Sequence, residues 1–337
     1  VWEMSYSPSI CTGCAKGCNI DVWVRDNRVM RLTPRENLDV NQYWMCDEGR
    51  LDIDRYNERR ISGPRVKGDI PVDFKQALQR AANALGKMQE NNKIIFLGSA
   101  SASMESNLAL KELAASYGRD KVYYVPHMEE GWGDDLLRKD DRTPNAKGCE
   151  ALGFEALDLA TLQKDFKDGD VSLLYMLEDN KTFEAVSKYA KKVPFIVHAT
   201  NYHPDMERAE VVLPAATEIE AEGTYMNIDG VPQVTKMAKS IRQMTPEMWM
   251  RVPKSRLDKA AVAIDRWRDL DNVQDVLPSW QLVALVAGAA GKDTGFNSHK
   301  EAYAALQAQV EALKDVKHSY KVPKEAFKIT QFDHAIR

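Results

Sequence analysis

The sequence predicts an α/β protein with three parts: a small β-rich N-terminal domain, a domain built on a mainly parallel sheet, and a helical C-terminal tail. Two observations support this prediction. Four of the five cysteines lie within the first 46 residues, and from about residue 94 short apolar runs alternate with amphipathic stretches of helical length. Strands that alternate with helices in this way are typical of a parallel sheet with helices on both faces.

The N-terminal cysteines have the spacing of a metal site. Cys11, Cys14 and Cys18 are separated by two and three residues, and Cys46 follows after twenty-seven more. Thiolates are soft ligands, and four without a histidine suit either a tetrahedral zinc ion or an iron-sulfur cluster. Structural zinc sites usually present two compact pairs of ligands, so this spacing favours a 4Fe-4S cluster. Zinc and disulfide bonds are the alternatives.

A β-hairpin is expected between the third and fourth cysteines. Alternating apolar residues flank Asp26 and Asn27, which tolerate the positive φ of a tight turn. The chain then returns through Trp44 and Met45 to Cys46. We expect these two side chains either to shield the metal site from water or to pack in an ordinary core.

The middle of the chain predicts the α/β domain, because short apolar runs there alternate with stretches of helical periodicity. A short hairpin is expected over 61–73, with Asp73 as the N-cap of the first helix. The expected strands cover residues 94–97, 122–125, 171–177, 194–198 and 211–213. The expected helices cover residues 73–88, 103–117 and 182–190.

These patterns divide the chain into domains at 1–60, 61–240 and 241–337, the last being helical with segments near 280–290 and 301–313. A chain of 337 residues that is 44% hydrophobic and 28% charged has the composition of an ordinary globular protein. Its net charge of -4 argues against nucleic acid as a partner. No apolar run reaches the ~20 residues of a membrane span, so no direct span is expected. The cysteine usage indicates a reducing compartment.

The segments around the cysteines resemble the iron-sulfur entry domain of the molybdopterin oxidoreductase superfamily. The resemblance rests on the cysteine spacing and on the flanking segments 19–25, 28–35 and 46–50. Within the superfamily, the chain is most similar to the family of the large iron-sulfur protein, the G subunit, of bacterial NADH:quinone oxidoreductase, respiratory complex I. Segments 134–149 and 213–233 extend the resemblance.

The resemblance implies an iron-sulfur electron-transfer and scaffold subunit in the peripheral arm of complex I, with a reduced molybdopterin oxidoreductase fold. One 4Fe-4S cluster would be bound by Cys11, Cys14, Cys18 and Cys46, and no catalytic residue is implied in this chain. The implied partners are a flavin-bearing NADH-oxidising subunit, a 2Fe-2S subunit and the subunits that connect to quinone. These partners would hold the chain peripherally on the cytoplasmic side of the inner membrane.

The chain departs from the catalytic members of the superfamily at two points. Those members carry a molybdenum or tungsten ligand in a middle domain several times longer than 98–150, and they tend to have Lys-Gly two residues after the fourth cysteine. This chain has Glu48 and Gly49 there, and a carboxylate would repel the anionic pterin. We therefore expect the molybdopterin to have been lost. The alternatives are a shortened molybdopterin or tungstopterin oxidoreductase, such as a formate dehydrogenase subunit, and a zinc-stabilised interaction module.

Other candidate residues have ordinary structural interpretations. Cys149 is expected in a polar loop as a small residue and not as a metal ligand. The serine-rich turn at 98–103 suits an N-capped loop between a strand and a helix better than a phosphate site, since no phosphate-binding motif accompanies it. The carboxylates of Glu218, Glu220 and Glu222 are expected on a solvated edge or at an interface with a neighbour.

Overall fold

The fold was analysed in a computed structural model of the chain. It describes residues 4–316 except for 68–69, 88–92, 135, 159, 162–163, 165–167, 169–170, 178–181, 184–185, 187–192, 240 and 242–273. Among the described residues, no helix is both long and apolar enough to cross a bilayer.

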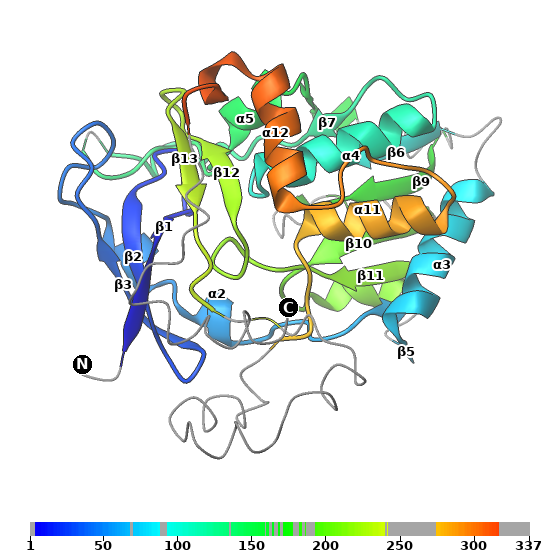
Figure 1. The fold of residues 1–337 in the computed structure, drawn as a ribbon, viewed down its shortest axis with the longest axis horizontal. Coiled ribbons are helices and arrows are strands. Elements are labelled where there is room, and N and C mark those ends of the chain that lie inside the picture. The colour runs from blue at the N-terminus through cyan, green and yellow to red at the C-terminus, as the bar shows by residue number, and fades with distance from the viewer. Residues whose placement is uncertain are drawn as a thin grey trace.

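A three-stranded antiparallel sheet forms the N-terminal part (Figure 1). Its strands, in spatial order, are β1 (Ser5–Ile10), β2 (Asn19–Arg25) and β3 (Arg28–Pro34). The turn residues Asp26 and Asn27 have φ angles of 49° and 57°, which confirms the expected tight hairpin. Two short helices follow, α1 (Asp47–Leu51) and α2 (Asp54–Asn57).

An eight-stranded sheet forms the larger part, in the order β5-β4-β11-β10-β9-β6-β7-β8. The pairs from β11 to β8 are parallel, while β4 and β5 add an antiparallel edge. This arrangement confirms the α/β prediction. The strands are β4 (Arg65–Val66), β5 (Ile70–Pro71), β6 (Lys93–Leu97), β7 (Tyr123–Tyr124), β8 (Glu155–Ala156), β9 (Val171–Met176), β10 (Phe195–Ala199) and β11 (Val211–Pro214).

Side chains alternate between the two faces of the larger sheet, as the period of a β-strand requires. On β6, Ile94 and Phe96 pack in the core beneath the helices, whereas Ile95 and Leu97 pack on the opposite face. Both faces are therefore buried, which explains why the central strands are continuous apolar runs in the sequence.

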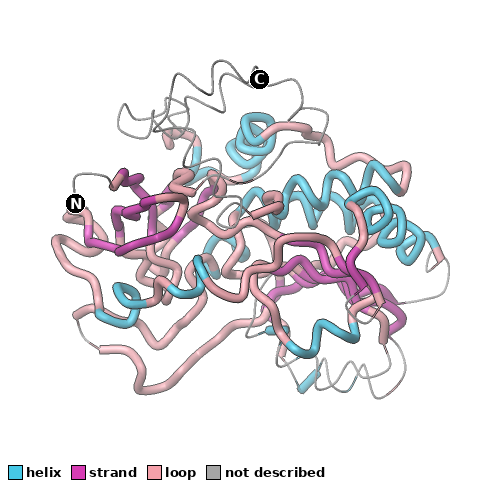
Figure 2. The backbone as a smooth tube through the Cα atoms, turned by 90° about the horizontal axis from the view of Figure 1, so that it is seen from below, coloured by secondary structure: helices cyan, strands magenta, loops and turns pink. Residues whose placement is uncertain are grey.

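Four of the described helices lie on one face of the larger sheet and share a core with it (Figures 1 and 2). They are α3 (Phe74–Gly86), α4 (Met104–Ser116), α11 (Ser279–Ala289) and α12 (His299–Gln309). Asp73 caps α3 by accepting a hydrogen bond from the Gln76 amide at 2.7 Å, as expected. Ser103 likewise caps α4 by accepting from the Ser106 amide at 3.3 Å, so the serine-rich turn is an N-capped loop. Short 3₁₀ segments lie at Pro204–Arg208 and Glu311–Leu313.

A hairpin of β12 (Gly223–Met226) and β13 (Pro232–Thr235) lies between the two sheets (Figure 1). β13 packs against β1, while β12 packs against α4 and α5 (Ala146–Ala151). The Gln233 side chain donates to the Gly17 carbonyl at 2.8 Å. Gly17 has a φ of 64°, and a Cβ there would lie 2.7 Å from Gln233 Oε1, so this contact requires glycine. The hairpin thus joins the N-terminal sheet to the α/β part.

The structure corrects one local expectation and leaves another outside the described residues. Cys149 lies in helix α5, completely buried in the core, and not in a polar loop. The helix expected over 182–190 falls largely outside the residues that the structure describes.

The close approach at Gly98, which follows β6, gives a test of this packing. A Cβ at Gly98 would clash with the Phe154 ring and lie 2.5 Å from Asn107 Oδ1, the atom that accepts from the Ser99 amide at 3.0 Å. We expect Gly98→Ala to lower the free energy of unfolding by about 1–3 kcal/mol. The control is Gly86→Ala in α3, where nothing lies within 4 Å and alanine favours the helix by up to about 1 kcal/mol. Urea unfolding that gave equal stabilities for the two variants would contradict the described packing.

Candidate metal centre

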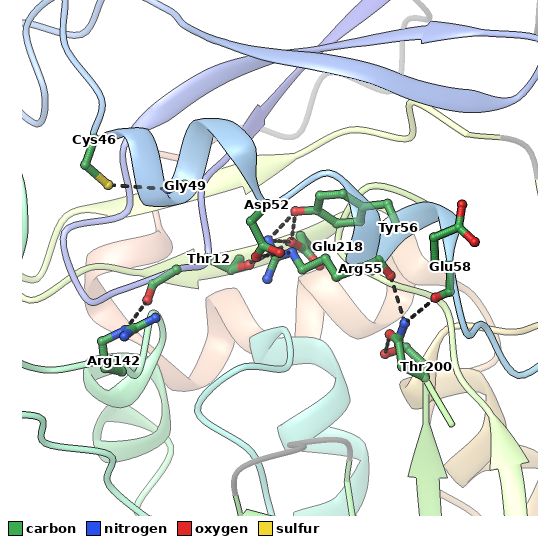
Figure 3. Close-up of polar contacts among 12 residues, drawn as sticks. Thr12, Cys46, Gly49, Asp52, Arg55, Tyr56, Glu58, Arg142, Thr200 and Glu218 are labelled. Carbon is green, nitrogen blue, oxygen red and sulfur yellow. Dashed lines mark hydrogen bonds and ion pairs between the residues drawn. The ribbon is translucent and has the colours of Figure 1, made fainter. Parts of the chain in front are cut away.

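The four N-terminal cysteines line one cavity of about 500 Å³. Cys11 directly follows β1 and Cys18 directly precedes β2, so the antiparallel pair brings the two ends of the loop together. The Cys11 amide donates to the Cys18 carbonyl at 2.8 Å, and Cys14 lies between them on the loop. Cys46 is the N-cap of α1, where its Sγ accepts from the Gly49 amide at 3.4 Å (Figure 3). The fold thus gathers all four expected residues.

Burial makes two of these thiols, Cys11 and Cys18, poor acids. Cys11, Cys14 and Cys18 are only 7%, 5% and 5% exposed. Burial raises the pKa of the Cys11 thiol to about 12, although the nearby Arg55 guanidinium opposes the rise, and burial also raises the pKa of Cys18 to about 12. A bound metal supplies the positive charge that makes such thiols ionise. The environment therefore suits ligands better than free cysteines.

The space around the sulfurs also fits a cluster. A Cβ at Gly49 would lie 2.7 Å from Cys11 Sγ, so a side chain at that position would crowd the cavity. Within the described residues, no three or more His, Cys, Asp or Glu side chains are placed to share one metal ion. In a 4Fe-4S cluster each cysteine binds a different iron, so its four ligands line a cavity and do not converge on a point. The donor set and the cavity are compatible with this cofactor.

The apolar wall of the cavity comes from two parts of the chain. Met45 is 4% exposed and lines the cavity together with Trp132 and Leu137. Trp44 is 59% exposed, so the expectation that it shields the site or packs in a core is wrong for this residue. Glu48 also lines the cavity, which places a carboxylate beside the cysteines.

The cysteine loop is fixed by a segment distant in the sequence. Arg142 Nε donates to the Gly13 carbonyl at 2.8 Å (Figure 3), and the Ala15 amide donates to the Asp141 carbonyl at 2.8 Å. The Arg142 guanidinium lies over the Trp132 ring, 3.8 Å from its centroid. Sequence reasoning did not identify Arg142. The only signal available was its position inside the segment 134–149 that carries the family resemblance.

A second group of polar residues meets the loop at Thr12, next to Cys11 (Figure 3). Thr12 Oγ1 donates to Glu218 Oε1 at 2.7 Å and accepts from Arg55 Nη2 at 2.8 Å. Arg55 Nη2 also lies 2.8 Å from Glu218 Oε1, and the Tyr56 hydroxyl donates to the same oxygen at 2.6 Å. Burial would raise the pKa of Glu218, but Arg55 and these hydrogen bonds outweigh it and hold that pKa below its usual value.

Two of the three glutamates, Glu218 and Glu220, therefore do not lie on a solvated edge, which was one of the two expectations for them. The Glu218 side chain is 10% exposed, and that of Glu220 is completely buried. Glu220 pairs with Arg60 Nη2 at 2.6 Å and lies 3.6 Å from Lys239 Nζ. A buried carboxylate needs such partners, because an unpaired charge in the interior is costly. Glu222 lines a second cavity.

The second cavity, of about 250 Å³, lies next to the cysteine cavity. Gly13, Asp52 and Arg142 line both. Its other walls include the serine-rich loop before α4 and the segments that follow β10 and β11. Cys149 lines neither cavity; its Sγ lies 3.7 Å from the Ser99 carbonyl oxygen in the core.

Comparison with protein families agrees with this geometry. Residues 4–58, which include all four cysteines, match the molybdopterin oxidoreductase Fe4S4 domain. Residues 143–249 match the molybdopterin oxidoreductase family. The first match supports an iron-sulfur cluster in the cavity that the cysteines line.

Several curated proteins are similar in sequence to part of this chain. The G subunit of NADH-quinone oxidoreductase from Pseudomonas fluorescens is 40% identical over 116 residues, covering 34% of this chain and 12% of that protein. The G subunit of the Escherichia coli K12 enzyme is 40% identical over 134 residues, covering 38% of this chain and 14% of that protein. The corresponding Pseudomonas putida protein is 36% identical over 131 residues, with coverage of 39% and 14%. The matched regions therefore span a small fraction of these relatives.

Cysteine substitutions test the assignment of ligands. We expect Cys46→Ala to abolish the electron paramagnetic resonance signal of the reduced cluster, because the chain offers no other thiol at that corner of the cavity. The variant should also become protease-sensitive before residue 60, since a small domain depends on its metal for folding energy. Cys149→Ala, the matched control, should keep the signal. The opposite result, with the signal lost in the Cys149 variant and kept in the Cys46 variant, would refute the assignment.

Proposed function

We propose that this chain is an iron-sulfur electron-transfer and scaffold subunit of an NADH:quinone oxidoreductase. Its cofactor is one 4Fe-4S cluster, whose ligands are Cys11, Cys14, Cys18 and Cys46. The observation that carries this proposal is the single cavity lined by these four residues. The similarity to the G subunits of bacterial NADH-quinone oxidoreductases supports the assignment to such a complex.

The residues around the cavity bind, enclose and hold the cofactor. When bound, the cluster accepts and passes on single electrons. Met45, Trp132 and Leu137 exclude water from the apolar side of the cavity. Arg142 holds the Gly13 carbonyl and so keeps the ligand loop in place. Among the described residues that line the cysteine cavity, we identify no nucleophile or acid-base pair placed to act on a substrate. Electron transfer is therefore the chemistry that we propose.

A molybdopterin, the other cofactor of the matched families, does not fit the neighbouring space. The second cavity has a volume of about 250 Å³, below the roughly 300–1,000 Å³ of sites for drug-sized ligands. Asp52, Glu218 and Glu222 line it, and of the two arginines in its wall Arg55 is already paired with Asp52 and Glu218, so little positive charge is left for the phosphate of a pterin cofactor. The Arg55–Glu218 pair, 2.8 Å apart, also closes the space next to the cysteine loop. We therefore propose a molybdopterin oxidoreductase fold that binds the iron-sulfur cluster but no molybdopterin.

The complex and its location are part of the same proposal. The partners are a flavin-bearing NADH-oxidising subunit, a 2Fe-2S subunit and the subunits that connect to quinone. Through them the chain is held peripherally on the cytoplasmic side of the inner membrane. Within the chain, 1–60 forms the cluster domain, 61–240 the α/β domain and 241–337 a helical region whose described helices pack onto α3 and α4.

One observation favours a second candidate, a shortened molybdopterin or tungstopterin oxidoreductase. The match of residues 143–249 is to a family named for that cofactor. This candidate requires a molybdenum or tungsten atom in the protein, whereas the first requires iron alone.

Metal analysis of anaerobically purified protein distinguishes these candidates. We expect iron and acid-labile sulfide in the Fe4S4 ratio, four of each per chain, with no molybdenum, tungsten or zinc. Each ligand thiolate should bind one iron, which gives a broad visible absorption that bleaches on reduction. Stoichiometric molybdenum or tungsten would replace the first candidate by the second. Bound zinc with a featureless visible spectrum would contradict both and indicate a zinc-stabilised module.

A further inference from the structure

Two cations are held at fixed positions beside the cysteine loop: Arg142, described above, and Arg55. Arg55, on α2, donates through Nη2 to Thr12 Oγ1 at 2.8 Å and to Glu218 Oε1 at 2.8 Å. Its Nε lies 3.1 Å from Asp52 Oδ2, and its guanidinium lies over the Tyr56 ring, 4.5 Å from the centroid. With four partners on different sides, the guanidinium has little freedom to move, so its charge stays in one place.

The Arg55 guanidinium contacts the residue next to a proposed ligand. Thr12 directly follows Cys11 in the loop, and Asp52, the ion-pair partner of Arg55 Nε, lines the cysteine cavity itself. The Arg55 side chain is 31% exposed and that of Glu218 only 10%, so water screens the pair incompletely. A charge in this environment acts on its neighbours more strongly than one on the open surface.

Glu218 and Asp52, the two carboxylates paired with Arg55, have different roles. Glu218 comes from the segment after β11, far from the loop in sequence, and its Oε1 accepts from Thr12, Arg55 and Tyr56 together. It therefore fixes both the loop and the guanidinium, while its negative charge offsets part of the positive charge (Figure 3). Asp52 offsets a further part, from a more exposed position.

We propose that Arg55 raises the reduction potential of the cluster through its fixed positive charge, and that Glu218 is a positioning residue that holds Arg55 and opposes its charge. The inference rests on the proposed function, because it requires the cluster. Reduction adds one electron to the cluster and therefore one negative charge, with no bond made or broken in the chain. A nearby cation stabilises the reduced form and a nearby anion destabilises it.

The test is a redox titration of the purified protein, with dithionite as reductant and the electron paramagnetic resonance signal of the reduced cluster as readout. At a fixed potential, Arg55→Gln should lower the ratio of reduced to oxidised cluster about tenfold, which corresponds to about 59 mV for one electron. Arg55→Lys, which keeps the charge, should stay close to the unaltered protein. Glu218→Gln, nearly isosteric, should shift the ratio in the opposite direction, toward the reduced form.

A charge that is exposed and far from the loop provides the matched control. Arg28 pairs with Glu58 at 2.9 Å on the surface, with side chains 47% and 58% exposed. Arg28→Gln removes the same charge with the same substitution and should leave the midpoint potential unchanged, because solvent screens it.

The results of these measurements distinguish a failure of the charge effect from a failure of the proposed function. If the unaltered protein has no iron and no signal, the proposed function fails. If it has the signal but Arg55→Gln and Glu218→Gln shift the potential in the same direction, or not at all, the charge effect is refuted and the two residues act only on loop structure. If Arg55→Gln assembles no cluster, the reduction potentials of Arg55→Lys and Glu218→Gln are compared instead. The inference expects a higher potential in Glu218→Gln, and equal potentials in the two variants would overturn it.

Discussion

Burial of three thiols at the end of a three-stranded sheet is the constraint on which the N-terminal part of this molecule depends. Cys11, Cys14 and Cys18 occupy space that an ordinary core would give to larger apolar side chains. The core around Cys11 and Cys18 is small, and it includes Met45, Tyr56, Ile219 and Ala238 in addition to the apolar side chains of the hairpin. A domain of this size buries little apolar surface, so the proposed cluster would supply much of its folding free energy.

The rest of the chain fixes the geometry of that site. Arg142 reaches the Gly13 carbonyl, Gln233 reaches the Gly17 carbonyl, and Glu218 reaches Thr12, so three separate segments hold one loop. Each contact comes from the α/β part or from the hairpin that joins it to the N-terminal sheet. A scaffold of this kind keeps the cluster position constant, which electron transfer between fixed centres requires.

Sequence reasoning succeeded where the signal is local. The turn at Asp26 and Asn27 and the helix cap at Asp73 depend on contacts within a few residues, and the structure has both in the expected places. The serine-rich turn is an N-capped loop, as expected, with Ser103 as the cap. Sequence reasoning failed where a partner is distant. Thr12 and Glu218 are 206 residues apart, so nothing local distinguishes this buried carboxylate from a solvated one, and the interior role of Glu218 became visible only in the fold.

Hydrogen exchange with and without the metal tests the central claim, that the cluster carries the folding of the N-terminal sheet, most directly. The account predicts that removing iron with a chelator and an oxidant exposes the amides of β1, β2 and β3 to fast exchange, while β6, β9 and β10 keep their protection because their core does not involve the cysteines. Unchanged protection of β1, β2 and β3 in the iron-free protein would contradict it.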